Sequence, residues 1–226
     1  MRSKILGVCV LLAFFTAIPA CAEGAAKVIP APTIDNPRAP GDPQTAVLAG
    51  GCYWGMQAVF EHVKGIQKVI AGFAGPRLIP GQADRISSGF VPAEAVEITF
   101  DPNQISYGQI LQIYFSVAHD PTELDMQGPD HGVRYRSNIF FEDDSQEKIA
   151  NAYIAQLDAA AVYGAPIVTR VDRYPGFQRT TVPQQDFVLK NPTMPYVVVI
   201  DMPKLASLKA LFPGLYSDQW LTVSGS

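Results

Sequence analysis

The stretch Leu48-Ala49-Gly50-Gly51-Cys52-Tyr53-Trp54-Gly55 places a cysteine where a strand pattern changes to a helix pattern. A short apolar, β-prone run precedes it, and the mixed spacing after it is typical of a helix. We therefore expect Cys52 in the first helical turn, where unpaired backbone N–H groups and the helix dipole favour a thiolate. Tyr53 and Trp54 place two aromatic faces beside the sulfur. The competing interpretation is a small cysteine buried among core aromatic residues.

The rest of the pattern predicts an α+β fold. The strand, helix, strand, strand, helix, strand order is that of a split βαβ unit, so we expect a two-layer sandwich with a mixed sheet and a ferredoxin-like core. The expected strands are 45–49, 66–73, 94–100, 135–141, 167–171 and 196–200, and the expected helices are 52–65, 107–118, 143–161 and 205–211.

Two carboxylates and a tyrosine outside the cysteine motif are further candidate site residues. Residues 94–100 alternate so that Glu94 opens the more apolar face of a strand, although a glutamate there is most often a solvated edge residue. Asp130 lies in a polar loop between proline and histidine, where it would ordinarily form a turn. Tyr135 would ordinarily be a strand residue half in the core.

Residues 1–22 have the features of an export signal. Two basic residues precede an apolar run over 5–18, which is too short to span a bilayer, and small residues follow it. Cleavage after Ala22 would release the protein into the periplasm. Cys21 also lies in a loose lipoprotein box, in which it would carry a lipid anchor. We predict export and leave both endings open.

The remaining chain divides into a linker, one domain and a tail. Residues 23–44 are rich in proline and predict an extended linker. Residues 45–216 are long enough for one domain with a substantial core, and 217–226 form a tail. The chain has a net charge of −4 and no cluster of basic residues, which argues against nucleic acid as a partner. We expect a monomer without a metal or a cofactor.

Several motifs in the right order resemble the A-type peptide methionine sulfoxide reductases. The first is Gly-Gly-Cys-Tyr-Trp-Gly at 50–55, where the usual family form has phenylalanine in place of tyrosine. The others are Phe60-Glu61-His62-Val63-Lys64-Gly65, Ala71-Gly72-Phe73-Ala74-Gly75, Ala93-Glu94-Ala95-Val96, Phe100-Asp101-Pro102, His119-Asp120-Pro121-Thr122 and Gln127-Gly128-Pro129-Asp130-His131-Gly132-Val133-Arg134-Tyr135-Arg136-Ser137. The resemblance implies a split βαβ core wrapped by irregular segments.

The resemblance also implies the catalytic roles. Cys52 would attack the sulfoxide sulfur. Glu94 would protonate the oxygen, since desolvation on an apolar strand face raises a carboxyl pKa. Tyr135 would hydrogen-bond that oxygen.

Substrate binding is likewise implied by the family. Tyr53 and Trp54 would hold the ε-methyl group, and Asp130 would position the substrate. One-sided placement of the methyl group admits a single sulfoxide epimer, which the resemblance identifies as the S epimer.

The chain departs from the family at three places. Ala83 stands where a second oxygen-binding tyrosine is usual, which would remove about 2–3 kcal/mol of transition-state stabilisation. The segment before Glu94 is one residue shorter, with Pro92 in place of histidine. Val182, Pro183 and Gln184 replace the family's acidic and histidine residues. The Tyr53 hydroxyl is the one polar group added near the site.

Recycling of the nucleophile needs an external thiol. Attack would leave Cys52 as a sulfenic acid, and no cysteine follows it in the chain. A thioredoxin-like protein or a small thiol must therefore regenerate it.

Three alternatives to a reductase deserve weighing. A papain-like hydrolase would have its histidine some 130 residues beyond the cysteine, but the last histidine is His131. The three histidines lack the paired spacing of a zinc site. A degenerate reductase fold that binds oxidised or apolar protein segments without turnover is the alternative from another functional class.

Overall fold

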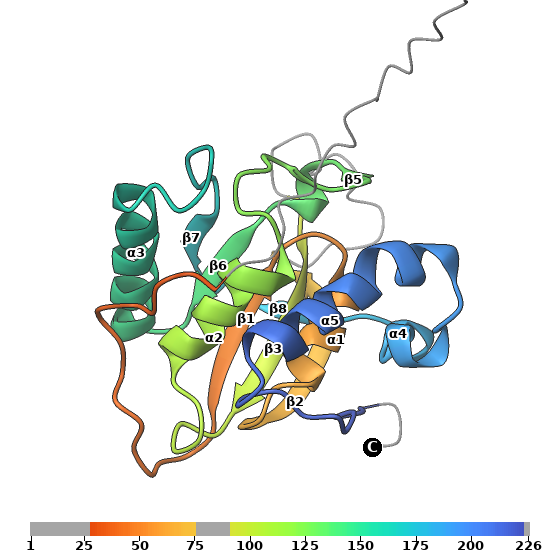
Figure 1. Ribbon diagram of the computed structural model, residues 1–226, viewed down its shortest axis with the longest axis horizontal. Coiled ribbons are helices and arrows are strands. Elements are labelled where there is room, and N and C mark those ends of the chain that lie inside the picture. Colours follow the sequence, from red (N-terminus) through yellow and green to blue (C-terminus); the bar gives the residue numbers. More distant parts are fainter. Residues whose placement is uncertain (1–27, 76–90, 224–226) are drawn as a thin grey trace, which may run out of the picture.

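The computed structural model describes residues 28–75 and 91–223, which form a curled six-stranded sheet covered by helices (Figure 1). Neighbouring strands are antiparallel except β6 and β7, which are parallel. In sheet order the strands are β7 (Arg170–Arg173), β6 (Asn138–Phe141), β1 (Gln44–Ala49), β3 (Ala93–Phe100), β2 (Ile66–Ala74) and β8 (Phe177–Arg179).

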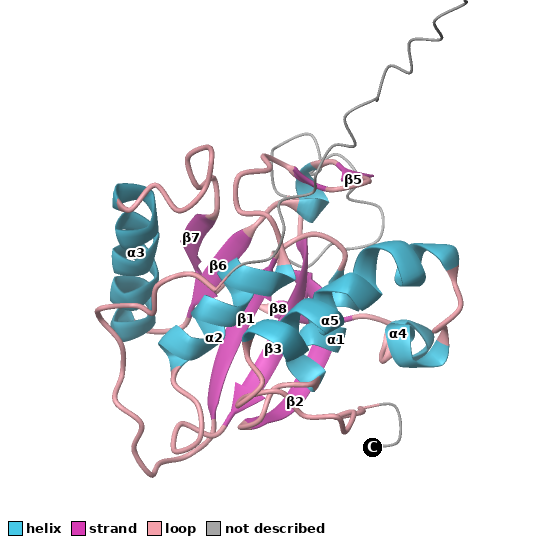
Figure 2. Cartoon of the chain, in the orientation of Figure 1, coloured by secondary structure: helices cyan, strands magenta, loops and turns pink. Residues whose placement is uncertain are grey.

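The helices gather on one face of the sheet, as Figure 2 shows for α1, α2 and α5. The helical elements are α1 (Tyr53–Glu61), α2 (Tyr107–Ile113), η2 (Tyr114–Ala118), η3 (Val133–Tyr135), α3 (Asp144–Ala159), η4 (Val182–Gln184), α4 (Phe187–Lys190), η5 (Val197–Asp201) and α5 (Met202–Leu211). A small hairpin, β4 (Met126–Gln127) with β5 (Asp130–His131), precedes η3. Among the described helices, none combines the length and apolar character needed to span a membrane.

Alternation along β3 divides the core into two clusters. Val96, Ile98 and Phe100 are fully buried against the helices, where they form part of the main core. Ala93 and Ala95 face the opposite side, in a smaller cluster against which Tyr174 and Phe177 pack. The predicted α+β fold, its mixed sheet and the alternation over 94–100 are therefore confirmed.

Three predicted strands need correction. Residues 196–200 are not a strand: Tyr196 precedes the π-helix η5, which continues into α5. Val197 and Asp201, four residues apart, are buried, whereas Val198 and Val199 are exposed. This helical burial pattern shows that packing against α1 overrides the β-propensity of the run. The other two strands begin three residues later than predicted, at Asn138 and Arg170.

The segment that precedes the sheet is extended but is attached to the domain. Ile29 is buried, and the Pro30 carbonyl accepts a hydrogen bond of 2.7 Å from the Tyr153 hydroxyl on α3. The Asp35 carboxylate accepts hydrogen bonds from the Ser106 hydroxyl and from the Gly108 N–H, 2.8 Å away, at the start of α2. The described part of the predicted linker is therefore not a free spacer.

The segment after α5 is attached in the same way. The Ser217 N–H donates to the His62 carbonyl, and the Trp220 ring meets the His62 ring edge-on at 4.1 Å. Val223 is buried, and its N–H donates to an oxygen of Asp186. The described part of the predicted tail thus belongs to the folded domain.

Candidate functional site

Cys52 is the N-cap residue of α1, at the junction between β1 and the helix. The turn depends on Gly51, which has a φ of +88° and whose missing Cβ would lie 2.6 Å from the Gln127 side chain. The Cys52 side chain is half-buried, and it is a free cysteine. The predicted strand-to-helix position of the cysteine is therefore confirmed to within one residue.

The electrostatic surroundings favour the thiol over the thiolate, which corrects the expectation from the helix dipole. Burial raises the pKa of Cys52, and the negative charge of Glu94 raises it further. The Trp54 N–H lowers the pKa of Cys52, whereas Asp201 and Asp130 raise it. The helix terminus is present, but desolvation and three nearby carboxylates outweigh it.

Glu94 is a buried residue of the central strand β3, so its interpretation as a solvated edge residue is wrong. Its Oε2 accepts a hydrogen bond of 3.3 Å from the Tyr53 N–H, in the first turn of α1. Burial raises the pKa of Glu94, opposed by the Tyr53 N–H and by Arg134. A carboxyl group with a raised pKa next to a thiol is suited to donate a proton.

Asp130 and Tyr135 approach the same place from the segment that contains the hairpin and η3. Burial raises the pKa of Tyr135, and the charges of Glu94, Asp130 and Cys52 raise it further, which places these four groups near one another. Tyr135 lies in η3 rather than in a strand, and its side chain is half-buried. The structure therefore places the predicted site residues Glu94, Asp130 and Tyr135 near Cys52.

Tyr196 is a site residue that the sequence analysis missed. Its hydroxyl donates a hydrogen bond to Oδ2 of Asp130. Burial raises its pKa, and the next largest cause is the charge of Cys52. The run of β-branched residues after Tyr196 predicted a strand. In the structure the segment is helical, and this places the Tyr196 hydroxyl near the cysteine. No sequence signal other than the tyrosine itself marked it.

Three contacts fix the Trp54 side chain. Its ring stacks on Phe187 of α4, with centroids 3.7 Å apart and planes within 7°. Tyr196 meets the same ring edge-on at 5.7 Å, and the indole N–H donates to Oε1 of Gln184 at 2.9 Å. Gln184 thus orients the tryptophan. A fixed aromatic wall beside Cys52 is suited to a methyl group.

The Tyr53 side chain contacts β2 and the residue that follows β8. Its ring meets Phe73 of β2 edge-on at 5.7 Å, and its hydroxyl pairs with the Thr180 hydroxyl at 3.2 Å. Burial raises the pKa of Tyr53, with smaller contributions from Glu94 and Cys52. The hydroxyl that this chain adds is therefore near the site, with Thr180 as its partner.

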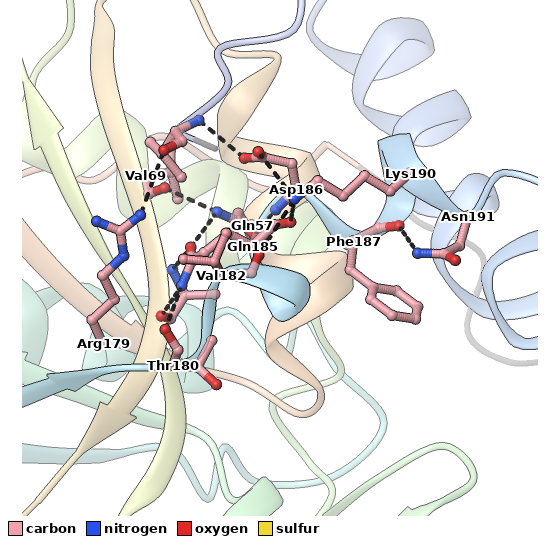
Figure 3. Close-up of polar contacts among 12 residues, drawn as sticks. Gln57, Val69, Arg179, Thr180, Val182, Gln185, Asp186, Phe187, Lys190 and Asn191 are labelled. Atoms are coloured by element: carbon pink, nitrogen blue, oxygen red, sulfur yellow. Dashed lines mark hydrogen bonds and ion pairs between the residues drawn. The ribbon is translucent and has the colours of Figure 1, made fainter. Parts of the chain in front are cut away.

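A buried amide network fixes the segment that carries Gln184 and Phe187 (Figure 3). Oε1 of Gln185 accepts hydrogen bonds from Gln57 Nε2 and from the Ala71 N–H, both at 3.0 Å. Its Nε2 donates to the Ala71 carbonyl at 2.7 Å. Oε1 of Gln57 in turn accepts from the Asp186 N–H at 2.9 Å. Both glutamine side chains are buried, so α1, β2 and this segment are tied together beneath the site.

Ala83 lies outside the described residues, so the effect of the missing tyrosine stays a prediction. Within residues 28–75 and 91–223, no group of three or more histidine, cysteine or acidic side chains has the arrangement of a metal site.

Known proteins resemble this chain over most of its length. The sequence model described as "Peptide methionine sulfoxide reductase" matches residues 44–212. "Peptide methionine sulfoxide reductase MsrA 2" of Mesorhizobium japonicum is 50% identical over 187 residues, covering 82% of this chain and 95% of that protein. "Peptide methionine sulfoxide reductase MsrA" of Chromobacterium violaceum is 39% identical over 176 residues, covering 77% and 99%.

A solved structure agrees with these sequence relatives. "Methionine sulfoxide reductase A of Corynebacterium diphtheriae" superposes with a TM-score of 0.53 at 26% identity, covering 76% of this chain and 91% of that one. The fold of that structure, the matched sequence model and the two relatives all indicate a methionine sulfoxide reductase. The position of Cys52 at the start of α1 agrees with them. The chain belongs to the peptide methionine sulfoxide reductase family.

Proposed function

We propose that the protein reduces the S epimer of methionine sulfoxide in peptides and proteins, with Cys52 as the nucleophile. The main support for the proposal is that a thiol and a carboxyl group lie at the same helix terminus. The Trp54 N–H interacts with Cys52, and the Tyr53 N–H binds Glu94 at 3.3 Å. A sulfur nucleophile and a proton donor are thereby held side by side on rigid elements.

The first half of the reaction transfers oxygen from substrate to enzyme. The Cys52 sulfur bonds to the sulfoxide sulfur while Glu94, protonated because its pKa is raised, donates a proton to the sulfoxide oxygen. The proton that Cys52 loses replaces the one that Glu94 gave. The oxygen then passes to Cys52 as the bond between the two sulfurs breaks. Methionine leaves, and the cysteine thiol has become a sulfenic acid.

The second half restores the thiol with two reducing equivalents from outside. A first external thiol attacks the sulfenic acid, which releases water and leaves a mixed disulfide with Cys52. A second thiol, on the same reductant, attacks that disulfide and frees Cys52 as a thiol. Since no cysteine follows Cys52, a thioredoxin-like dithiol protein or a small dithiol fills this role.

Selectivity for one epimer follows from the unequal sides of the site. The face of Trp54 and the edge of Tyr196 form an apolar wall for the methyl group. Glu94 and Tyr135 provide the proton donor and a hydroxyl for the oxygen, and Asp130 with Tyr196 orients the substrate. Only one arrangement of methyl group and oxygen then leaves the sulfur in line with Cys52.

The place of action is proposed from the first 22 residues. Their basic start, apolar run and small residues before position 23 are those of an export signal, so the protein would repair oxidised methionine in exported proteins. Cleavage after Ala22 gives a periplasmic monomer, and lipidation of Cys21 gives one that is membrane-anchored.

Epimer-resolved peptides test this function. The protein, with dithiothreitol as the reductant, should convert a methionine-S-sulfoxide peptide to the methionine peptide and leave the R epimer unchanged. Chromatography of the peptides measures both reactions. Binding of oxidised peptide without conversion of either epimer would instead identify a degenerate fold that recognises oxidised segments.

A further inference from the structure

A second buried carboxyl group, that of Asp201, lies against the first turn of α1 at Gly55. Asp201 ends η5 and is only 1% exposed. Among the described residues, neither of its carboxylate oxygens has a hydrogen-bond partner. Buried carboxyl groups without partners are rare because burial without hydrogen bonds is unfavourable. Its position next to the proposed nucleophile therefore calls for a functional explanation.

Gly55 is the residue of α1 that admits this carboxyl group. A Cβ at position 55 would overlap Oδ1 of Asp201 and would lie 3.2 Å from its Cγ. The same Cβ would lie 3.3 Å from Nζ of Lys204. The glycine that ends the Gly-Gly-Cys-Tyr-Trp-Gly stretch thus leaves space for a carboxyl group within one helical turn of Cys52.

Charged and titratable groups of several neighbouring elements surround this carboxyl. Asp130 raises the pKa of Asp201 and Lys204 lowers it, but burial is the largest cause and leaves that pKa at about 6. Tyr196, which precedes η5, faces the same charge. His119, just after η2, is buried, and its lowered pKa keeps it neutral. Asp201 is therefore ionised above about pH 6, with Lys204 as the nearby cation.

A negative charge at this place opposes ionisation of Cys52. The first-turn N–H groups of α1 are the groups that would stabilise a thiolate, and a carboxylate beside the same turn repels the thiolate charge. The Asp201 charge is also among the causes that raise the pKa of Cys52. Its contribution adds to those of Glu94 and Asp130.

We propose that Asp201 is a positioning residue that keeps Cys52 in its thiol form, acting from the space left by Gly55. The inference rests on the proposed role of Cys52 as the nucleophile. A thiol reacts slowly with general oxidants and electrophiles, so Asp201 reserves Cys52 for a substrate that Glu94 protonates. Asp201 contacts no substrate in this scheme.

Alkylation of Cys52 by iodoacetamide tests the proposal without requiring reductase activity. In Asp201→Asn, loss of the charge should lower the pKa of Cys52 by about one unit. The thiolate fraction at pH 8 then rises about tenfold, but a less basic thiolate is a weaker nucleophile, so alkylation should accelerate about threefold. At pH 5, where Asp201 is protonated, the variant and the native protein should react at equal rates.

Two further variants make the outcome decisive. Asp201→Ala should accelerate alkylation at pH 8 in the same way, and it replaces Asp201→Asn if that variant does not fold. Asp218→Asn removes an exposed carboxylate paired with Lys209 at 2.8 Å and should leave the rate unchanged. Equal alkylation of Asp201→Asn and native protein at pH 8, or an acceleration that persists unchanged at pH 5, would overturn the proposal. A protein that shows the predicted alkylation but reduces no sulfoxide would contradict the proposed function alone.

Discussion

At the scale of single residues, Cys52 and Glu94 depend on the same few backbone N–H groups. The Tyr53 N–H is given to Glu94, so the thiol receives only part of the stabilisation that a helix terminus offers. Burial and the charges of three carboxylates add to this effect, which explains why the sequence-based expectation of a thiolate is wrong although the predicted position of Cys52 is right. Because Cys52 is a thiol, its reaction with the sulfoxide depends on the proton that Glu94 donates to the sulfoxide oxygen.

Replacement of Glu94 by glutamine should lower the single-turnover rate by about 10²- to 10⁴-fold, because glutamine keeps the size but donates no proton. The native rate should fall as pH rises through the pKa of Glu94, since the acid must be protonated, and burial moves that fall to higher pH. Stopped-flow rates from pH 5 to 9 measure both effects. A Glu94→Gln variant with the native pH profile would show that another group supplies the proton.

Sequence motifs could identify Cys52, Glu94, Asp130 and Tyr135 because each lies within a recognisable local pattern. Tyr196 and Asp201 have no such pattern. They reach the site because η5 packs on α1, and the β-branched run between them predicts a strand. The missed residues are therefore those whose position depends on tertiary packing rather than on local sequence.

At the scale of elements, the aromatic wall of the site depends on a four-residue helix. Phe187 of α4 stacks on Trp54, while Gln184 just before it orients the indole. The buried amides of Gln57 and Gln185 hold this segment on β2. The wall is thus tied to the sheet by buried hydrogen bonds.

Phe187→Ala should loosen Trp54 and raise KM for a methionine-S-sulfoxide peptide. A stacked aromatic pair contributes about 1 kcal/mol beyond its buried area, which corresponds to an increase of about fivefold. The value of kcat should change less, because Cys52 and Glu94 keep their places. Leu189→Ala, an exposed apolar residue of the same helix, serves as the control and should leave KM unchanged. An unaltered KM in Phe187→Ala would contradict this role for the stack.

At the scale of the whole molecule, the segments before β1 and after α5 wrap the domain. The first binds α2 and α3 through Asp35 and Pro30, and the second reaches Asp186 through Val223. Proline content predicted the extended form of the first segment. Its attachment could not be predicted, because single side-chain contacts to distant helices leave no periodic pattern.

Glu61 near the second segment should make the stability of the protein depend on pH. Burial, and then the charge of Asp186, raise the pKa of Glu61 to about 9, whereas the unfolded chain has its ordinary value near 4.5. The native state therefore holds the proton between these values, and the free energy of unfolding falls as pH rises through that range. The loss at pH 7 is on the order of 3 kcal/mol.

Glu61→Gln should remove that slope, so the variant gains stability over the native protein at pH 8 and much less at pH 5. Urea unfolding at the two pH values measures the difference. Asp144→Asn, at an exposed side chain on α3, provides the matched loss of a carboxylate and should not change the slope. Parallel pH profiles for Glu61→Gln and native protein would show that Glu61 is ionised in the folded state.

The central claim, that Cys52 takes the oxygen from methionine sulfoxide, is tested most directly by one turnover without a reductant. Reduced protein mixed with excess methionine-S-sulfoxide peptide should yield one methionine peptide per chain and one sulfenic acid at Cys52, counted by mass spectrometry after dimedone trapping. The R epimer and the Cys52→Ser variant should each yield none. Methionine peptide formed by Cys52→Ser, or an unmodified Cys52 in native protein after product has appeared, would contradict the account.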